Sequence, residues 1–424
     1  MIVEQIRRSE AEKPLLDVED LVVHYPVKIP FLQRLVIREK LVVHAVDGVS
    51  FKLRPGEILG LVGESGCGKT TVGRSIMRLT DPTSGHIRFE GTDITSLKEK
   101  ELRPMRTRIQ IIFQDPHAAL NPAMSIGRAI GHPLEVHGIS KDPEEIRQAV
   151  LAIMREVGLT PEEQLYGQYP GDLSGGQKQR AVIARAMILR PRLLVADEPV
   201  AMLDMSIRAK VLELMLELKA RHGLTYLFIT HDLATAKFVC DRIAIMYLGR
   251  IVEIGPAKEI YADPKHPYTR ALLAAIPVPD PTKKRVPKVL PRGEVPDAIH
   301  PPAGCRFHPR CPVSLPTCGW EGHDFIDFLE ERWLAPTNAS AEARLGPVEE
   351  WGADGLIAFR RSPGESQAVL VEQIRSILAS TNSSMTQAIE AVDDRDNELV
   401  LRFRPPVKLE PKPVEGRIVE CLLY

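Results

Sequence analysis

Residues 63–70 read Gly63-Glu64-Ser65-Gly66-Cys67-Gly68-Lys69-Thr70 and match the phosphate-binding loop pattern G-x-x-x-x-G-K-[ST] at every fixed position. The loop follows the apolar run 58–62, which reads as a buried strand, and precedes a helix expected to open at Thr70 and Thr71. Its glycines let backbone N–H groups point at phosphate oxygens, and the helix N-terminus adds partial positive charge. Lys69 can reach the outer phosphates, and the Thr70 hydroxyl suits a magnesium ligand. A glycine-rich turn that binds nothing is the alternative, but the context favours a nucleoside triphosphate site.

The bulk composition excludes several classes of protein. The 424 residues carry a formal net charge of −1, so no global field draws the chain to nucleic acid or to an acidic membrane. The length predicts two or more compact units. No stretch approaches the roughly 18 apolar residues of a membrane span, and the N-terminus lacks a secretory apolar region. Six cysteines are too few for a secreted disulfide scaffold. We therefore expect a cytosolic chain that reaches a membrane only through a protein partner.

Predicted strands and helices alternate along the first two thirds of the chain. Strands that read as continuous apolar runs between helices indicate a mostly parallel sheet covered on both faces. Residues 28–40 interrupt the early strands and are expected to form an extended hairpin loop. The predicted strands are 15–18, 21–25, 46–53, 58–62, 109–113, 193–196 and 225–230; the predicted helices are 70–80, 177–189 and 207–222, with a helical region joined by prolines at about 115–172.

Two acids end the apolar strand 193–196. Asp197 is placed to hold the magnesium shell, and Glu198 to orient or deprotonate the water that attacks in phosphoryl transfer. Acid pairs at strand ends are common, so this pair gains its meaning from following a phosphate-binding loop in the same chain.

A second candidate anion site precedes the helix 177–189. It reads Leu173-Ser174-Gly175-Gly176-Gln177, and a serine hydroxyl with exposed amides at a helix N-terminus can bind an anion. A Ser/Gly helix start without a ligand is a frequent alternative. Gln114 and His231 each follow a strand, where a polar residue caps more often than it catalyses.

Taken in this order, these features resemble the nucleotide-binding subunit of ABC transporters over residues 15–275. The resemblance implies an α/β fold, an ABC-type P-loop ATPase with a mostly parallel sheet core, an antiparallel β subdomain and a helical subdomain, in a domain spanning 1–275. It implies two subunits stacked head to tail, with each ATP between the phosphate loop of one and Ser174–Gln177 of the other. Tyr25 matches the aromatic that stacks on adenine, against the alternative of a half-buried strand tyrosine.

The same resemblance assigns roles around the phosphates. It implies that Mg²⁺ is held by Thr70, Asp197 and Gln114, that Gln114 relays to the permease, and that His231 steadies the γ-phosphate. The loop after the acids reads Ala201-Met202-Leu203-Asp204, where the family usually has Ser-Ala-Leu-Asp; Asp204 joins the ATP-binding set. The missing hydroxyl leaves open whether this is the less active of two unequal sites. Because Glu198 and His231 are both present, hydrolysis is still expected.

A narrower resemblance lies in the segments 265–273, 276–281 and 304–312, which look like the C-terminal region of oligopeptide/dipeptide importer ATPases. The loop insert at 27–44 is similar to that of the OppF or DppF type of subunit. This branch implies ATP-driven peptide import at the cytoplasmic face of the cell membrane, where the subunit is peripheral. The implied partners are a second, related ATPase subunit, two membrane permeases and an extracytoplasmic solute-binding protein, with no nucleic acid. Nickel chelates, glutathione or oligosaccharides are alternative solutes, and a soluble ABC ATPase acting on ribosomes or nucleic acid is the alternative class.

Three cysteines gather in the proline-rich tail 276–319, namely Cys305, Cys311 and Cys318. In a reducing cytosol metal ligation is favoured over disulfides, with chance clustering as the alternative. Relatives with this tail imply a 4Fe–4S cluster held by four thiolates. Their fourth cysteine precedes a short apolar chain end, which here selects Cys421, so that 412–424 completes the motif. A Zn²⁺ site using His308 with the three tail cysteines is the competitor.

Residues 320–411, which we call the insert, separate the tail cysteines from Cys421. The insert holds all three tryptophans, predicted strands at 356–359 and 398–403, and an amphipathic helix at 367–378. Closing a loop about fourfold longer adds only on the order of 1 kcal/mol, so its length is no obstacle. We expect a small folded α/β unit with neighbouring ends, to which the sequence assigns no function.

Overall fold

The computed structural model describes residues 13–27, 41–276, 291, 293–361, 367–381, 383–395 and 398–424. The chain divides into two compact units, Met1–Asp263 and Pro264–Tyr424, called the first and second unit below. The hairpin loop expected at 28–40 lies outside the described residues, as does the proline-rich stretch 277–290. Within the described residues, no helix combines the length and the apolar character that crossing a bilayer requires.

The core of the first unit is a mostly parallel sheet. Its strands β3, β8 and β7 are buried along their whole length, because each is a continuous apolar run. Within the first unit the order is β10-β9-β3-β8-β7-β6, parallel except for β10, so the predicted fold class is confirmed. The bounds are β3 Ile58–Val62, β6 Ile109–Ile112, β7 Leu193–Asp197, β8 Thr225–Thr230, β9 Arg242–Tyr247 and β10 Arg250–Pro256.

A smaller antiparallel sheet, in the order β2-β1-β4-β5, forms the β subdomain of the first unit. The two strands predicted at 15–18 and 21–25 are one strand, because register shifts in its pairing with β2 absorb the break between them. The strand predicted from residue 46 begins earlier, at Val42. The bounds are β1 Leu16–Pro26, β2 Val42–Leu53, β4 Ser84–Phe89 and β5 Thr92–Asp93.

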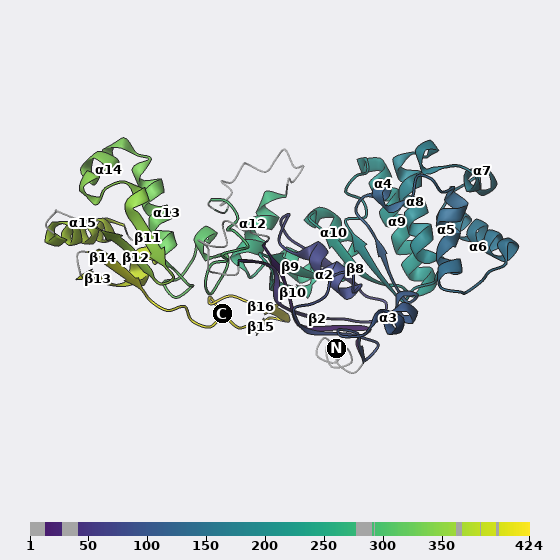
Figure 1. Cartoon of the computed structure of the whole chain (residues 1–424), viewed down its shortest axis with the longest axis horizontal. Helices are drawn as coiled ribbons and strands as arrows, with labels where there is room; N and C mark the ends of the chain where they lie inside the picture. Colours follow the sequence, from purple (N-terminus) through teal and green to yellow (C-terminus); the bar gives the residue numbers. More distant parts are fainter. Residues whose placement is uncertain are drawn as a thin grey trace. The chain divides into compact units, whose positions relative to one another are not determined.

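Helices cover the parallel sheet and form a separate group, α4 to α8, at one end of the first unit (Figure 1). The helix predicted at 70–80 is shorter, since α2 ends at Ile76 and Arg78 has a positive φ of 52°. The bounds are α2 Lys69–Ile76, α3 Glu99–Arg106, α4 Pro116–Ala119, α5 Ile126–Val136, α6 Pro143–Glu156, α7 Glu162–Tyr166, α8 Gly175–Met187, α9 Met205–His222, α10 Leu233–Val239 and α11 Ala257–Ala262, with a 3₁₀ turn at Pro170–Asp172.

The second unit contains the cysteine segment and the insert. The insert has its own hydrophobic core, in which Phe325, Leu401 and Phe403 are essentially fully buried. Its sheet runs β11-β12-β14-β13, and its two ends lie close, since Val407 N donates to Thr317 O at 3.2 Å. The bounds are α12 Pro267–Ala275, α13 Gly322–Trp333, α14 Pro336–Ala341, β11 Trp351–Asp354, β12 Ile357–Arg361, α15 Gln367–Ser380, α16 Ser384–Ala388, β13 Ile389–Arg395, β14 Glu398–Phe403, β15 Lys412–Val414 and β16 Arg417–Val419, with 3₁₀ turns at His308–Arg310, Ala343–Leu345 and Val348–Glu350.

The tail around the cysteines differs from the expectation of a loop with little core. Phe307 is 1% exposed and packs its ring against Tyr268 at 5.3 Å between centroids. His308 is fully buried and meets Trp320 of the insert edge-on at 4.6 Å. Aromatic side chains from helix α12 and from the insert therefore supply the core that the tail's own sequence lacks.

Candidate active site

The phosphate-binding loop joins the end of β3 to the start of α2, which begins at Lys69, one residue before the predicted start. Gly68 forms the helix N-cap with a φ of 104°, in the left-handed region that favours glycine. A Cβ at this position would lie 2.0 Å from the carbonyl oxygen of Ala45, so the close approach of β2 also requires glycine. The loop's backbone path is therefore fixed by both conformation and packing.

Lys69 is 5% exposed and lies folded over its own loop. Its Nζ donates to the carbonyl oxygens of Gly63 and Glu64, each at 2.8 Å, and lies 3.7 Å from the Cys67 sulfur. Burial raises the pKa of the Cys67 thiol, so Cys67 is a buried neutral group of the loop. The ammonium is thus held within the loop by two backbone carbonyl oxygens.

The structure brings Thr70 and Asp197 together, the hydroxyl Oγ1 donating to the carboxylate Oδ1 at 3.0 Å. Neighbouring oxygen ligands of an octahedral Mg²⁺ at roughly 2.1 Å lie about 3 Å apart, so this pair fits two positions of a magnesium shell. Burial, helped by the charge of Glu198, raises the pKa of Asp197. A divalent cation would offset that cost and keep the carboxylate ionised.

Glu198 lies at the centre of the site, between the ends of three adjacent parallel strands. Its Oε2 accepts from Gln114 Nε2 at 3.1 Å, and its Oε1 lies 3.0 Å from His231 Nδ1. Its φ of 47° is strained for a residue with a side chain, and its N–H donates to Ile229 O at 2.9 Å. A hollow of about 20 Å³ lined by Glu198, Thr230 and His231 has room for roughly one water molecule.

The second candidate anion site lies at the N-terminus of α8, away from α2. Ser174 is the N-cap of α8 and accepts from Gln177 N at 3.3 Å, while the Gln177 side chain accepts from Ser174 N at 2.9 Å. Ser174 and Gly175 are exposed, whereas Gly176 is buried against Ile207. Helix α8 contacts α4, α5 and α9, and α2 contacts β2, β7 and β8 (Figure 1).

Three further predicted residues take no part in the hydrogen bonds described around Asp197 and Glu198. Tyr25 lies near the end of β1 and is 39% exposed. Asp204 is exposed at the N-cap of α9, and Thr71 follows Thr70 inside α2. Their assignment to the ATP site therefore remains a prediction.

Family models match two parts of the chain. One described as ABC transporter covers residues 46–201, and one described as oligopeptide/dipeptide transporter, C-terminal region, covers 252–318. The probable peptide ABC transporter ATP-binding protein y4tS of Sinorhizobium fredii is 47% identical, over 76% of this chain and 89% of the relative. The oligopeptide transport ATP-binding protein OppF of Escherichia coli is 46% identical, over 73% and 92%.

The chain belongs to the family of ABC transporter ATP-binding proteins. It is an ATPase of the ABC type. Among solved structures, the dimeric post-hydrolysis state of the ATP-binding cassette MJ0796 with ADP and Pi is similar, with 27% identity and a TM-score of 0.50, covering 57% of this chain and 98% of that chain. The cbiO1 subunit from Clostridium perfringens, described as part of the cbiONQ transporter complex, has 28% identity and the same TM-score.

Four cysteines line one small cavity of about 10 Å³ in the second unit, and we call this set the cysteine pocket: Cys305, Cys311, Cys318 and Cys421. Burial, with smaller contributions from Cys318 and Cys421, raises the pKa of Cys311 to about 11, so these thiols lie close enough to interact. None of the six cysteines, all of which the structure describes, forms a disulfide. The remaining two, Cys67 and Cys240, belong to the first unit.

The spacing of the pocket sulfurs distinguishes between kinds of metal site. Ligands of one zinc ion at about 2.3 Å lie no more than about 4.6 Å apart. Among the described residues, no three of the pocket cysteines have sulfurs within 4.8 Å of one another. His308, the proposed fourth zinc ligand, has Nδ1 2.8 Å from Cys305 O and Nε2 3.3 Å from the Asp324 carboxylate. Both ring nitrogens are thus already engaged, which disfavours the zinc alternative.

Sequence reasoning missed a groove between the parallel sheet and the helical group. Its volume is about 480 Å³, and its lining includes Phe113, Met124, Val136, Pro133, Arg185 and Leu189. These residues come from a strand end and from helices far apart in the sequence, so no local motif marks them. The predicted helical pattern at 115–172 was the available signal, but it does not show which helix faces leave a gap.

Proposed function

We propose that the chain is the ATP-hydrolysing subunit of an ABC importer for peptides. The observation that carries the proposal is the position of Glu198, held between Gln114 and His231 beside the Thr70–Asp197 pair. A carboxylate in that place can orient a water molecule and accept its proton as the water oxygen bonds to the γ-phosphorus. The bond to the bridging oxygen breaks and ADP leaves.

The other site residues bind and align the nucleotide in this proposal. Lys69 and the loop amides would hold the phosphates, and Thr70, Asp197 and Gln114 would supply oxygen ligands for Mg²⁺. The ion would neutralise the charge that develops on the phosphate oxygens. His231, beside Glu198, would contact the γ-phosphate and steady it.

A second ATPase subunit completes the chamber. Ser174 and Gly175 are exposed at a helix N-terminus, which can bind an anion but lies apart from the chain's own phosphate loop. This arrangement supports a head-to-tail dimer in which a related subunit contributes the facing wall, with Tyr25 on adenine and Asp204 near the subunit boundary. The similar cassette MJ0796 is described as dimeric, which supports the pairing of two ATPase subunits.

The membrane partners would contact the groove of about 480 Å³. Its mixed lining, mostly apolar with several polar side chains, suits a short amphipathic segment of a permease, and Phe113 of the groove directly precedes Gln114 of the catalytic site. We propose two permeases and an extracytoplasmic solute-binding protein as the remaining partners, with this subunit peripheral at the cytoplasmic face of the membrane. Residues 1–275 would form the nucleotide-binding domain, 276–319 with 412–424 the cysteine tail, and 320–411 an accessory unit.

Peptides are the proposed solute because the relatives are named for peptide transport and the tail matches the oligopeptide/dipeptide model. The test is purification of the tagged full chain from detergent-solubilised membranes, with mass spectrometry of the proteins and of the ligand in the solute-binding protein. A peptide ligand and peptide-stimulated ATPase activity in the reconstituted complex are expected. A nickel chelate, glutathione or an oligosaccharide in that protein would overturn the solute, and recovery with ribosomes alone would overturn the transport role.

We propose further that the cysteine pocket holds a 4Fe–4S cluster through its four thiolates. Four cysteines facing one cavity are the ligand set that such clusters use, and a multi-iron cluster keeps its ligands farther apart than a single zinc ion does. Iron and sulfide analysis after anaerobic purification, with visible absorption and Mössbauer spectra, tests it. Stoichiometric zinc without sulfide would favour the competitor.

A further inference from the structure

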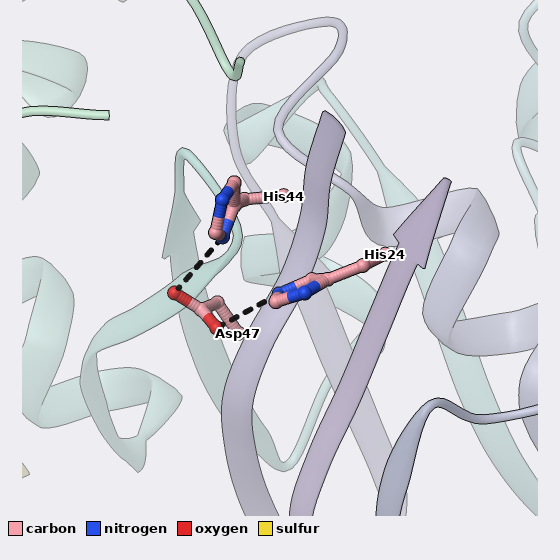
Figure 2. Close-up of side chains that lie close together, drawn as sticks. All are labelled: His24, His44 and Asp47. Atoms are coloured by element: carbon pink, nitrogen blue, oxygen red, sulfur yellow. Dashed lines mark hydrogen bonds and ion pairs between the residues drawn. The ribbon is translucent and has the colours of Figure 1, made fainter. Parts of the chain in front are cut away.

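Two histidines and an aspartate lie together on the antiparallel sheet of the first unit. His24 comes from β1, and His44 and Asp47 come from β2; Figure 2 shows both imidazole rings turned toward the carboxylate. His24 Nε2 lies 3.1 Å from Asp47 Oδ1, and His44 Nδ1 lies 3.8 Å from Asp47 Oδ2. The three ligand atoms all fall within 4.8 Å of one another, which no other His, Cys, Asp or Glu group does in the described part of the chain.

The strand pairing explains how these side chains share one face. His24 pairs with His44 and Val22 pairs with Asp47, while Val23 pairs with Val46. In a regular strand, residues 44 and 47 would point to opposite faces of the sheet. Between the 24–44 and 23–46 pairs, β2 has one extra residue, and this bulge places the side chains of residues 44 and 47 on the same face. A second shift follows at Gly48, whose φ is 84°. Two irregularities therefore aim Asp47 at the histidine pair.

We propose that His24, His44 and Asp47 form a binding site for a divalent transition-metal ion, with Zn²⁺ as the ion of choice. Zinc binds imidazole nitrogen at about 2.0–2.1 Å and carboxylate oxygen at about 2.0–2.2 Å, so its ligand atoms lie within roughly 4 Å of one another. The separations of 3.1 and 3.8 Å meet that requirement. Imidazole favours zinc, nickel or copper over Mg²⁺, which separates this site from the magnesium shell at Asp197.

The environment suits an exchangeable ion. The three side chains are 22–26% exposed, so the ligands are partly desolvated but reachable from solvent. Three protein ligands leave a fourth position for water or for another ligand. The alternative explanation is a hydrogen bond between one histidine and Asp47 with no metal ion. That explanation does not require the second histidine to lie within the same group.

The site lies on the segment that touches the phosphate-binding loop. Asp47 N donates to Gly249 O at 2.9 Å, and Gly249 N donates to Cys67 O at 3.0 Å. The carbonyl of Ala45 packs against Gly68, and Tyr25 is the next residue after His24. A metal ion bound here would link β1 to the part of β2 that contacts the phosphate-binding loop.

The test is a titration of the nucleotide-free full chain with Zn²⁺ by calorimetry and equilibrium dialysis, comparing wild type with His24→Ala, His44→Ala and Asp47→Asn. His86→Ala is the matched control, because His86 Nδ1 and Asp93 form a 2.8 Å pair on the same sheet and belong to no three-residue group in the described chain. We expect each site variant to lose one zinc per chain or to weaken its affinity at least tenfold, and the control to behave as wild type.

X-ray absorption of the bound zinc separates this site from the cysteine pocket, because sulfur ligands lie farther from the ion than nitrogen or oxygen do. The zinc that disappears in the variants should be ligated by nitrogen and oxygen. Circular dichroism of each variant checks that it is folded, and Asp47→Asn removes the charge with little change in shape. Equal zinc binding in all five proteins, or loss of only sulfur-ligated zinc, would overturn the proposal.

Discussion

The nucleotide site of the first unit and the cysteine pocket of the second unit are assembled in opposite ways. Glu198, Gln114 and His231 each follow a strand of one parallel sheet, so the ladder alone brings them together. The pocket instead joins a short irregular segment, 305–318, to Cys421 near the chain end. A site placed by a sheet needs few supporting side chains, whereas a site made from irregular segments depends on what packs around it.

The support for the cysteine segment comes largely from the insert. Asp324 lies 3.3 Å from His308, and the Glu321 carboxylate accepts from Ala303 N at 3.0 Å. Trp320 packs edge-on against the His308 ring. The comparison therefore predicts that changes in the insert disturb the second unit and spare the nucleotide site, whereas changes at Glu198 reduce ATP turnover and leave the second unit intact.

The largest effect is expected from Glu198→Gln. Removing the proton acceptor should reduce ATP turnover by about a hundredfold to ten-thousandfold while ATP binding stays intact. Turnover by phosphate release and affinity for a fluorescent ATP analogue measure the two properties in the reconstituted complex. Glu213→Gln, at an exposed position of α9, is the control. Wild-type turnover in Glu198→Gln would remove Glu198 from its assigned role.

The next effect in size is expected from Phe325→Ala in the core of the insert. Phe325 is fully buried, so the truncation should lower the free energy of unfolding of the second unit by about 3–5 kcal/mol. All three tryptophans lie in the insert, so their fluorescence in a denaturant titration reports on this unit. Val369→Ala, at a 42% exposed position, should change it by less than about 0.5 kcal/mol.

The affinity of Phe325→Ala for the fluorescent ATP analogue is measured as well, to test whether the two units are independent. If the two units are as independent as the comparison implies, Phe325→Ala leaves the affinity for the ATP analogue within twofold of wild type. A parallel loss of nucleotide binding would show that the insert supports the first unit as well, and the contrast between the two sites would fail.

The same difference explains how much the sequence could predict. The parallel strands are continuous apolar runs, and each site residue follows one of them, so the fold class and the Thr70–Asp197 and Glu198–His231 contacts were accessible from local patterns. The insert was predicted only in part: β12, α15 and β14 lie where expected, but α13 was missed although Phe325 and Leu329 have helical spacing. The positive φ of Glu198 and the aromatic packing around Phe307 depend on distant contacts that no local pattern shows.

A third prediction concerns Cys421, the cysteine of the cysteine pocket that lies outside the segment 305–318. Cys421→Ser should lose most of the iron bound per chain, because a serine hydroxyl replaces a thiolate ligand with a poor one. Iron and sulfide per chain after anaerobic purification are the measurement. Cys240→Ser, a buried cysteine of the first unit, is the control and should keep its iron. Equal iron in the two variants would exclude Cys421 as a ligand.

The smallest expected effect is a pH dependence confined to the second unit. His266 is 1% exposed, and burial, with a contribution from Arg270, lowers its pKa to about 3. An exposed histidine, as in the unfolded state, has a pKa of about 6.5. Between about pH 3 and about pH 6.5, His266 is therefore protonated in the unfolded state and neutral in the folded state. The contribution of His266 to stability is therefore complete above pH 6.5 and declines as the pH falls, by about 1.4 kcal/mol per unit or about 2 kcal/mol at pH 5.

His266→Asn isolates this effect, because the Nδ1 of His266 accepts from Tyr268 N at 3.1 Å as the N-cap of α12, and asparagine can cap a helix without titrating. Urea unfolding followed by tryptophan fluorescence at pH 7, 6 and 5 gives the free energy of unfolding at each pH. Between pH 7 and pH 5 that free energy should fall in the wild type, and it should fall by about 2 kcal/mol less in the variant. His323→Asn, at an exposed position of α13, should keep the wild-type slope. If His266→Asn also keeps it, the acid sensitivity of the second unit arises elsewhere, and the buried histidine beside the pocket is not what limits the unit at low pH.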